Sequence, residues 1–324
     1  MADILALVEH RQGAIRDITY ELMACGRSLA EETDGKLTAV VLGADTEGLV
    51  TPLKSQAHKL IVIDAPVFKD FNSASYQLAL SEIVKQEKPF ITLIGHTAFG
   101  MDLCPSLAVE LESPFTTDCL KIELADGSVK AVRQMFDGKL DARVRLRKGD
   151  SYFLTVRSGM YPAEDGGLAA EVTEMASPVA TEPDYRRFID YIEPAVGEVD
   201  ITKSDIVVGV GRGVKEQENI AMVEEFAEAI GGVVGCTRPV VDSEWLPKAR
   251  QVGSSGKTIK PKLYIALGIS GAFQHLAGLK GADTIIAVNK DPNAPIFNAA
   301  DYGIVEDMFK VLPALKEKIL EVKG

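Results

Sequence analysis

The chain has 324 residues, with 35 Lys and Arg side chains against 47 Asp and Glu, which gives a formal net charge of -12. This negative charge argues against nucleic acid or an anionic membrane as the main partner, because both would repel it. Hydrophobic residues make up 46% of the chain and charged residues 25%, which excludes a disordered or fibrous protein and, at this length, predicts two folded domains.

Neither the cysteines nor the histidines are spaced as metal ligands. The four cysteines form no CxxC pair, and no two of the four histidines are three or four positions apart. We therefore expect a reducing compartment and no bound metal. Because a strand-like apolar run at residues 4–8 directly follows the first three residues, we expect no targeting peptide and a bacterial or archaeal cytoplasmic location. No apolar run reaches the ~20 residues of a membrane-spanning helix, so no transmembrane segment is predicted.

The first half alternates β-rich runs with segments of helical periodicity. Strands are predicted at residues 4–8, 37–42, 60–62 and 90–94, with helices at 15–29 and 76–85. Such alternation predicts a parallel sheet with flanking helices. In residues 116–156, three alternating runs separated by turn-forming glycines predict an antiparallel addition, built of hairpins at a sheet edge. These runs are 129–133, 142–146 and 152–156.

Residues 175–197 are predicted to link two domains, because Pro178, Pro183 and Pro194 interrupt any helix or central strand there. We therefore assign residues 1–190 to an N-terminal α/β domain and residues 191–324 to a C-terminal domain. From residue 196 onward the chain has 17 acidic and 15 basic side chains, so its acidity belongs almost wholly to the first half. The two halves are expected to have different functions.

The second half again alternates strands and helices. Strands are predicted at 205–211, 232–235, 263–267 and 284–288, with helices at 220–230, at 272–279 and from about residue 306. The predicted fold class is therefore α/β, with two domains that are each an open, mostly parallel sheet with flanking helices. Such sheets bind ligands at the carboxyl ends of their strands.

Glycines follow two of the strands in the second half. Gly268-Ile-Ser-Gly271 precedes a predicted helix, where free N–H groups favour a phosphate or pyrophosphate. Asn289 comes 18 positions after Gly271, near the ~20-residue spacing at which dinucleotide folds contact the adenosine ribose. A turn that needs glycine for geometry alone is an equal alternative. Gly209-Val-Gly-Arg-Gly213 lacks the GxGxxG spacing, and Arg212 is either a phosphate clamp or a solvated turn residue.

The loop from Lys248 to Lys262 carries five cations and no acid, which indicates an anion nearby or, alternatively, a flexible solvated loop. Its Gly253-Ser-Ser-Gly256 segment offers backbone N–H groups and hydroxyls to a polar ring edge or a phosphate. His275 is either an electrostatic partner of a cofactor or a structural histidine. Cys236 has no neighbouring base, so cysteine catalysis is not predicted. The lack of an acid/base pair favours a redox cofactor.

An ordered run of residues resembles a known family. LYIALGISGAFQHLAG at 263–278 is followed by IIAVNKDPNAPIF at 285–297 and ADYGIV at 300–305. With Gly211-Arg-Gly, Arg238-Pro239 and QVGSSGK at 251–257, this run closely resembles the signature of the electron transfer flavoprotein alpha subunit. The resemblance covers essentially all of the second half, whereas the first half matches only in its α/β plan and position.

The resemblance implies a Rossmann-like C-terminal domain that binds one FAD per alpha subunit. The N-terminal domain is then expected to contact a beta subunit, which would itself hold AMP or a second FAD. The FAD-contacting positions that the resemblance implies are Arg212, Thr237, Arg238, Val252, Gly253, Ser254, Ser255, Ser270, Gly271, Ala272, Phe273, Gln274, His275, Asn289, Asp307 and Met308.

Three of these residues are implied to tune the flavin. Ser255 would direct its hydroxyl at N5, His275 would approach the oxygen at C2, and Arg238 would lie near the ring. Asn289 and Asp307 would serve the adenosine end. The chain departs from the family at 254–256, where Ser-Ser-Gly replaces the common Gln-Thr-Gly, and at Phe273, which replaces an aliphatic residue. FAD binding is still expected with these departures, which concern the fine tuning of the flavin reduction potential.

The implied function is electron transfer without catalysis of a substrate reaction. The heterodimer would accept electrons from flavin dehydrogenases, such as the acyl-CoA dehydrogenases of fatty acid β-oxidation. It would pass them singly, through an anionic flavin semiquinone, to a quinone reductase or another acceptor. One alternative is a bifurcating heterodimer that oxidises NADH at a flavin in the beta subunit. A stand-alone nicotinamide dehydrogenase is a second alternative, but the chain has neither a GxGxxG motif nor an acid/base pair. A third, an interaction module without cofactor, leaves the ordered signature unexplained.

Overall fold

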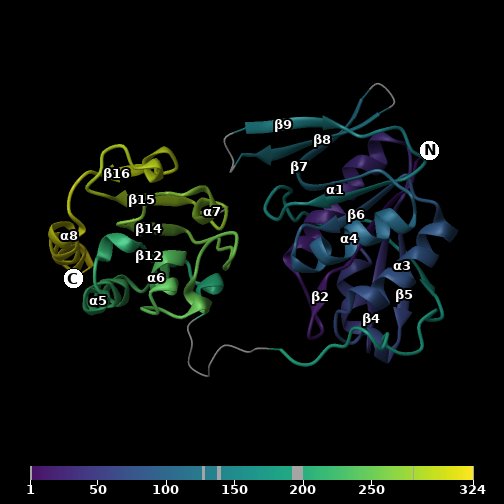
Figure 1. Cartoon of the computed structure of the whole chain (residues 1–324), viewed down its shortest axis with the longest axis horizontal. Helices are drawn as coiled ribbons and strands as arrows, with labels where there is room; N and C mark the ends of the chain where they lie inside the picture. The colour runs from purple at the N-terminus through teal and green to yellow at the C-terminus, as the bar shows by residue number, and fades with distance from the viewer. Residues whose placement is uncertain (1, 126–127, 137–139, 192–199, 280, 324) are drawn as a thin grey trace. The chain divides into compact units, whose positions relative to one another are not determined.

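The computed structural model describes residues 2–125, 128–136, 140–191, 200–279 and 281–323. The chain divides into two compact units, Met1–Asp190 (unit 1) and Tyr191–Gly324 (unit 2). Each unit is an α/β fold built on a mainly parallel sheet, as the sequence predicted (Figure 1). None of the helices described is both long enough and apolar enough to cross a membrane. No group of three or more His, Cys, Asp or Glu side chains in the described part of the chain could hold a metal ion.

Unit 1 contains a nine-stranded sheet in the order β11-β5-β4-β1-β6-β10-β7-β8-β9. Its strands are β1 (Ile4–Leu7), β4 (Leu37–Gly43), β5 (Lys59–Asp64), β6 (Ile91–Gly95), β7 (Phe115–Ala125), β8 (Ser128–Met135), β9 (Leu140–Arg145), β10 (Tyr152–Val156) and β11 (Glu171–Glu174). Its helices are α1 (Asp17–Glu32), α2 (Glu47–Val50), α3 (Ser73–Glu87) and α4 (Ala98–Glu110), and β2 (His10–Arg11) forms a short hairpin with β3 (Ala14–Ile15).

The central strands of unit 1 are buried on both faces. Helix α1 packs its apolar stripe, with Ile18, Leu22 and Leu29, against one face, because these residues recur at helical spacing. Helices α3 and α4 bury Leu80 and Leu107 against the opposite face. Strand β1 is therefore wholly apolar, as is typical of a parallel strand between two helical layers.

Two predictions for unit 1 need correction. Strands β7, β8 and β9 do form the predicted antiparallel addition, but β10, predicted as part of it, runs parallel between β6 and β7. All five residues of β10 are buried, so both of its faces pack against the core, whereas hairpin strands expose one face. The predicted linker is also anchored to unit 1 in its first part, because Val179 is buried in the core and Met175 N–H donates to Val62. Residues 192–199 of that linker lie outside the described residues.

Asn72 connects helix α3 to this anchored segment. Its Oδ1 accepts from the N–H groups of Ala74 (3.1 Å) and Ser75 (3.4 Å), which caps the helix. Its Nδ2 donates to Glu182 Oε1 (3.1 Å) and to the Arg186 carbonyl (3.0 Å). One buried side chain thus stabilises both the helix start and the segment that leads toward unit 2.

We expect Asn72→Ala to destabilise unit 1 by about 1–2 kcal/mol, because it removes the cap and both donated bonds. Asn72→Asp is the matched control, since it keeps a capping oxygen but places a carboxylate against Glu182. Thermal unfolding should separate the two variants, while trypsin should cleave after Arg186 faster in both than in the wild type. Cleavage of Asn72→Ala at the wild-type rate would show that Asn72 does not hold the segment.

Unit 2 contains a five-stranded, fully parallel sheet in the order β13-β12-β14-β15-β16. Its strands are β12 (Ile206–Val210), β13 (Val233–Cys236), β14 (Leu263–Leu267), β15 (Thr284–Val288) and β16 (Tyr302–Ile304), and its helices are α5 (Ile220–Ile230), α6 (Arg238–Asp242), α7 (Phe273–Leu276) and α8 (Met308–Lys323). Helices α5 and α8 share one hydrophobic cluster on one face of the sheet. Irregular segments and α7 cover the other face, around Tyr264 and Ile296.

The helix predicted at 272–279 is a single turn, Phe273–Leu276. Two residues after its end, Gly278 packs directly against the loop at Gly253, where a Cβ on Gly278 would lie 2.3 Å from the Gly253 nitrogen. A helix this short has little macrodipole, so individual N–H groups and side chains, rather than the helix, must provide most of any attraction for an anion.

Candidate functional site

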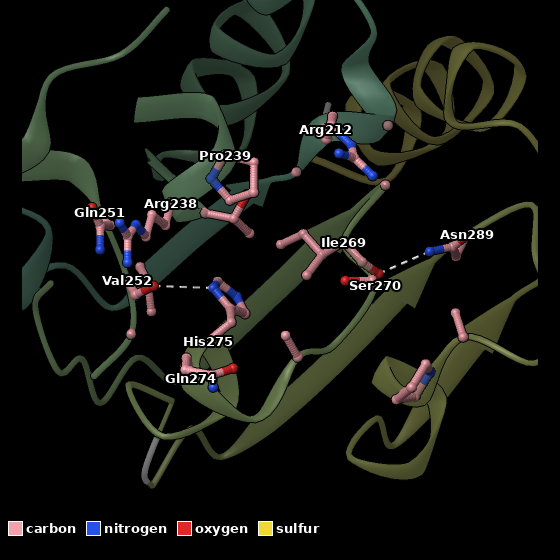
Figure 2. A pocket seen from close by; sticks show the side chains of 18 of the residues that line it. Arg212, Arg238, Pro239, Gln251, Val252, Ile269, Ser270, Gln274, His275 and Asn289 are labelled. Carbon is pink, nitrogen blue, oxygen red and sulfur yellow. Dashed lines mark hydrogen bonds between the residues drawn. The ribbon is translucent and has the colours of Figure 1, made fainter. Parts of the chain in front are cut away.

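A cavity of about 820 Å³ lies at the carboxyl ends of β12, β13, β14 and β15 in unit 2 (Figure 2). Strand order reverses between β12 and β14, and this is the position at which open parallel sheets bind their ligands. The residues that line the cavity are Gly211, Arg212, Gly213, Thr237, Arg238, Pro239, Gln251, Val252, Gly253, Ser254, Ser255, Gly268, Ile269, Ser270, Ala272, Gln274, His275, Asn289, Lys290, Asp291, Ala294 and Pro295.

Three glycines bring the ends of β12 and β14 together. Gly211 N–H donates to the Leu267 carbonyl (2.9 Å), and Gly213 N–H donates to the Gly268 carbonyl (3.1 Å). A Cβ on Gly211 would lie 2.4 Å from the Gly268 oxygen. The sequence left open whether these glycines bind a phosphate or serve the geometry of the turn. The contacts give the glycines a packing role, while the residues beside them line the cavity and are free to contact a ligand.

Most of the site residues predicted from the sequence surround this one cavity. The predicted residues that line it are Arg212, Thr237, Arg238, Val252, Gly253, Ser254, Ser255, Ser270, Ala272, Gln274, His275 and Asn289. Asp307 and Met308 instead line an adjoining hollow of about 50 Å³, which shares Asn289 and Lys290 with the main cavity. Gly271 and Phe273 do not line the cavity, and Gly271 packs against the backbone of Pro295 and Ile296.

The cavity wall contains a buried hydroxyl without a partner. Thr237 follows β13 and is 7% exposed, yet its Oγ1 has no hydrogen-bond partner among the described residues. A buried polar atom of this kind normally meets a ligand or a water. The loop at Gln251 is bridged to the end of β13, since Val252 N–H donates to the Cys236 carbonyl (2.9 Å). In this loop Gln251 Nε2 donates to Ser255 Oγ (2.8 Å), so the Ser255 hydroxyl keeps its own proton for donation. Gln251 thus supplies an amide near the position where the sequence lacked the family's Gln.

The positive charges around the cavity are Arg212, Arg238 and Lys290. In Figure 2, Arg238 lies beside Gln251 and Val252 on one side of the cavity, and Asn289 lies on the other. Arg238 is largely exposed, and its Nε lies 3.3 Å from Asp242 one helical turn away, a weak surface pair that a ligand can displace. Arg212 forms no ion pair with any residue that the structure describes.

The prediction that the cationic loop at 248–262 attracts a nearby anion needs correction. Lys257 lies 3.1 Å from Asp200, and Lys262 lies 2.9 Å from Asp205. Arg250 lies 4.0 Å from Glu224, and none of the five loop cations lines the cavity. The acidic side chains beside these three cations come from elsewhere in unit 2, outside the loop. Its contribution to the cavity is the uncharged segment 251–255.

His275 is held by both of its ring nitrogens. Nδ1 lies 3.1 Å from the Val252 carbonyl, as Figure 2 shows, and Nε2 lies 2.9 Å from the Tyr264 hydroxyl. The imidazole is 5% exposed, and burial lowers its pKa from 6.5 to about 4. It is therefore neutral near pH 7. Both ring nitrogens have partners within the chain, and the approach of His275 to a flavin oxygen stays a prediction.

Asn289 holds the loop after β15. Its Nδ2 donates to the Ile269 carbonyl (2.8 Å), and its Oδ1 accepts from Asp291 N–H (2.9 Å). The amide retains one N–H and one lone pair for a ligand. This side chain therefore joins the ends of β14 and β15 on the side of the cavity away from Arg238.

Several residues line the cavity without being among the FAD contacts implied by the resemblance. They are Pro239, Gln251, Ile269, Lys290, Asp291, Ala294 and Pro295, together with the framing glycines Gly211, Gly213 and Gly268. Lys290 and Asp291 could have been found, because they directly follow Asn289 at a strand end. Ala294 and Pro295 carry no chemical signal, and they reach the cavity through the loop that packs on Gly271.

Comparison with known proteins identifies the family of this chain. The electron transfer flavoprotein FAD-binding domain matches residues 200–280, and the electron transfer flavoprotein domain matches residues 4–180. The chain is 36% identical to electron transfer flavoprotein subunit alpha of Thermoanaerobacterium thermosaccharolyticum, over 99% of this chain and 98% of that protein. It is 34% identical to the same subunit of Bacillus subtilis, over 98% of each. It is 36% identical to acryloyl-CoA reductase electron transfer subunit beta of Anaerotignum propionicum, over 99% of this chain and 96% of that one.

Proposed function

Because the chain belongs to the electron transfer flavoprotein alpha-subunit family, we propose that unit 2 binds one FAD in its cavity. Paired with a beta subunit through unit 1, the chain accepts electrons from flavin dehydrogenases, such as acyl-CoA dehydrogenases. It passes them singly to a quinone reductase or another acceptor in the cytoplasm. The chain is a carrier, and it does not itself convert a substrate. The beta subunit would hold an AMP or a second FAD.

The observation that carries the proposal is the unpartnered Thr237 hydroxyl in the wall of a dinucleotide-sized cavity. The cavity volume of about 820 Å³ lies within the ~300–1,000 Å³ of small-molecule and cofactor sites. Thr237 Oγ1 is buried and lacks a hydrogen-bond partner among the described residues, so a ligand that meets it removes a desolvation penalty. A family that binds flavin supplies such a ligand.

Bound FAD would supply the electron chemistry, and the protein would hold and tune it. Arg212 and Lys290 would neutralise pyrophosphate charge, a role supported by their exposed position in the lining of the cavity. Ser255 keeps a hydroxyl proton for donation because Gln251 already donates to its oxygen. Arg238 would bring positive charge to the ring, where added negative charge is stabilised.

The switch point of the unit 1 sheet offers no room for a second FAD. There the strand order reverses between β1 and β6, but the cavity at their carboxyl ends is only about 10 Å³. The rings of Phe71 and Phe99 stack across it with centroids 4.0 Å apart. The Glu9 carboxylate accepts from the Thr97 hydroxyl (2.7 Å) at the start of α4. This space holds about one water and no nucleotide.

The proposed donors and partners rest on chemistry and on relatives. The relative from Anaerotignum propionicum is an electron transfer subunit of an acryloyl-CoA reductase, which supports exchange with enzymes that act on CoA thioesters. The acidity of residues 1–195 favours partner surfaces that carry positive charge.

The test is the flavin content of this chain co-purified with its beta subunit. We expect a yellow complex from which urea releases FAD. The isolated chain, stripped of flavin and then reconstituted, should take up one FAD. A chain that takes up none would contradict the proposal. NADH oxidation by a complex with two FAD molecules would instead identify the bifurcating alternative, while a single FAD without NADH oxidation supports the carrier.

A further inference from the structure

Lys215 directly follows the short turn at residues 212–214 and has an unusual backbone conformation. Its φ is +69° and its ψ is -48°, and the Glu216 N–H donates to the Val214 carbonyl across it (2.9 Å). These angles and this hydrogen bond define a γ-turn of the rare, strained kind. Asn219 Nδ2 donates to the same Val214 carbonyl (2.9 Å), which fixes the turn from a second side. Strained backbone at a residue other than glycine is concentrated at functional sites.

The Lys215 ammonium reaches the start of helix α8. Nζ lies 3.8 Å from Oδ2 of Asp307 and 4.9 Å from the centroid of the Phe309 ring. The other oxygen of the carboxylate is also engaged, because Asp307 Oδ1 accepts from the Phe309 N–H (3.1 Å) and so caps the helix. Lys215 and the helix start therefore each hold one oxygen of the same carboxylate, which fixes its orientation.

This carboxylate borders the space next to the main cavity. Lys215 and Asp307 both line the adjoining hollow of about 50 Å³. Asn289 and Lys290 line the hollow and the main cavity alike, so the two spaces meet beside the end of β15. A carboxylate held in one orientation can accept a hydrogen bond from a ligand hydroxyl at this point. In a dinucleotide the adenosine ribose carries such hydroxyls.

We propose that Lys215 is a positioning residue of the FAD site, which orients the Asp307 carboxylate toward the adenosine ribose. The inference rests on the proposed FAD site and adds a residue that the family resemblance does not imply. Lys215 acts through Asp307 and is not itself a ligand contact. The γ-turn destabilises the fold, whereas the orientation of Asp307 stabilises the complex with the ligand.

The test is a double-mutant cycle of FAD affinity in the full-length chain, built from Lys215→Met and Asp307→Asn. Methionine keeps the strained backbone and an unbranched side chain but removes the charge, and asparagine keeps a capping oxygen. We expect the FAD dissociation constant to rise about threefold in Lys215→Met, as befits a partly exposed ion pair. In the Asp307→Asn background, Lys215→Met should raise it no further, because the lysine acts through the carboxylate. Two independent, multiplying effects would overturn the proposal, as would an unchanged dissociation constant in Lys215→Met.

Lys215→Gly separates the orientation of the carboxylate from the stability of the fold. It also removes the ammonium, but it relieves the strain because glycine adopts positive φ readily. In thermal unfolding of the FAD-free chain, followed by the fluorescence of Trp245 in unit 2, Lys215→Gly should melt about 3 °C above Lys215→Met. Its FAD dissociation constant should nevertheless rise as much as that of Lys215→Met. Affinities that follow the melting temperatures would contradict a positioning role.

Lys262→Met is the matched control. Lys262 forms an ion pair with Asp205 in unit 2 (2.9 Å), but these residues precede β14 and β12 and so lie at the amino ends of the strands, away from the cavity. This variant should keep the wild-type FAD dissociation constant, and a rise equal to that of Lys215→Met would assign the effect to lost charge in general. If the wild type takes up no FAD, the proposed function fails and the role of Lys215 with it. If the wild type and Lys215→Met bind FAD equally well, only the role of Lys215 fails.

Discussion

Gly271→Ala is expected to leave the chain folded but to weaken FAD binding about 100-fold, so that it purifies largely without flavin. Gly271 has φ +86°, a left-handed conformation that costs an L side chain roughly 1–2 kcal/mol. An added Cβ would also lie 2.2 Å from the Ile296 nitrogen and 2.5 Å from its Cα, which are backbone atoms that cannot rotate away. Overpacking of this kind adds about 1–3 kcal/mol.

The strain at Gly271 should act on the cavity because both strained segments border it. Ser270 precedes Gly271 and lines the cavity, and Ala294 and Pro295 line it from the opposing loop. The Ile296 N–H donates to the Ser270 carbonyl (3.0 Å), so the two loops are joined at this point. Separating them by even a fraction of an ångström relieves the clash and moves ligand-contacting groups. About 3 kcal/mol lost in this way equals the expected 100-fold.

Gly281→Ala is the matched control. Gly281 also has φ +86°, but the nearest atoms to an added Cβ are Cγ and Cδ of Lys260, at 3.7 and 3.9 Å on a flexible side chain. It shares the conformational strain of Gly271 without the backbone clash. Absorbance of the purified complexes and titration with FAD should show near-normal flavin in Gly281→Ala and little in Gly271→Ala. Equal loss in both variants would assign the effect to backbone conformation, and full flavin in Gly271→Ala would remove this loop from the site.

The sheet of unit 2 could be predicted from the sequence because its signals are local. Each of the strands β12 to β15 is a short apolar run followed by glycine, threonine or asparagine. Strand β16 was not predicted, because Tyr302-Gly-Ile304 is only three residues long and is followed by Val305. Strand β10 could not be placed in the same way. Its alternation of aromatic, aliphatic and threonine residues fits both an edge hairpin and a central strand, and only its long-range pairing with β6 and β7 decides between them.

Thr237, Ser270 and Asn289 follow strand ends and line the same cavity, because parallel strands bring their carboxyl ends together. The partners of those residues were not predictable. Tyr264 and His275 are 11 positions apart and form a hydrogen bond. The Tyr264 hydroxyl has room for it only because Gly209, in the neighbouring strand β12, has no side chain. The cations of the 248–262 loop were misassigned because their acidic partners, such as Asp200 and Asp205, are distant in the sequence.

Lowering the pH from 7 to 4 is expected to destabilise unit 2 through His275. Burial depresses the pKa of this imidazole from 6.5 to about 4 in the folded chain, while the unfolded chain keeps the ordinary value. Between these two values the unfolded state binds more protons, so stability rises with pH. The contribution of His275 is complete above about pH 6.5 and is lost as pH falls toward 4. The total is about 3 kcal/mol, at ~1.4 kcal/mol per pH unit.

The single tryptophan of the chain, Trp245, packs against the core of unit 2, so its fluorescence reports unfolding of that unit. Urea unfolding of the FAD-free, full-length chain at pH 5 and at pH 7 should therefore show a lower midpoint at pH 5. His275→Gln removes the titrating group, so its urea midpoint should be lower than that of the wild type at pH 7 but should change less between pH 5 and pH 7.

His10→Gln, in unit 1, is the control that should keep the wild-type change of midpoint with pH. Because Asp200 and Glu306 in unit 2 have lowered pKa values and also lose stability on acidification, the difference between wild type and His275→Gln is the quantity that matters. Equal slopes in these two chains would show that the buried imidazole is not the source of the pH dependence.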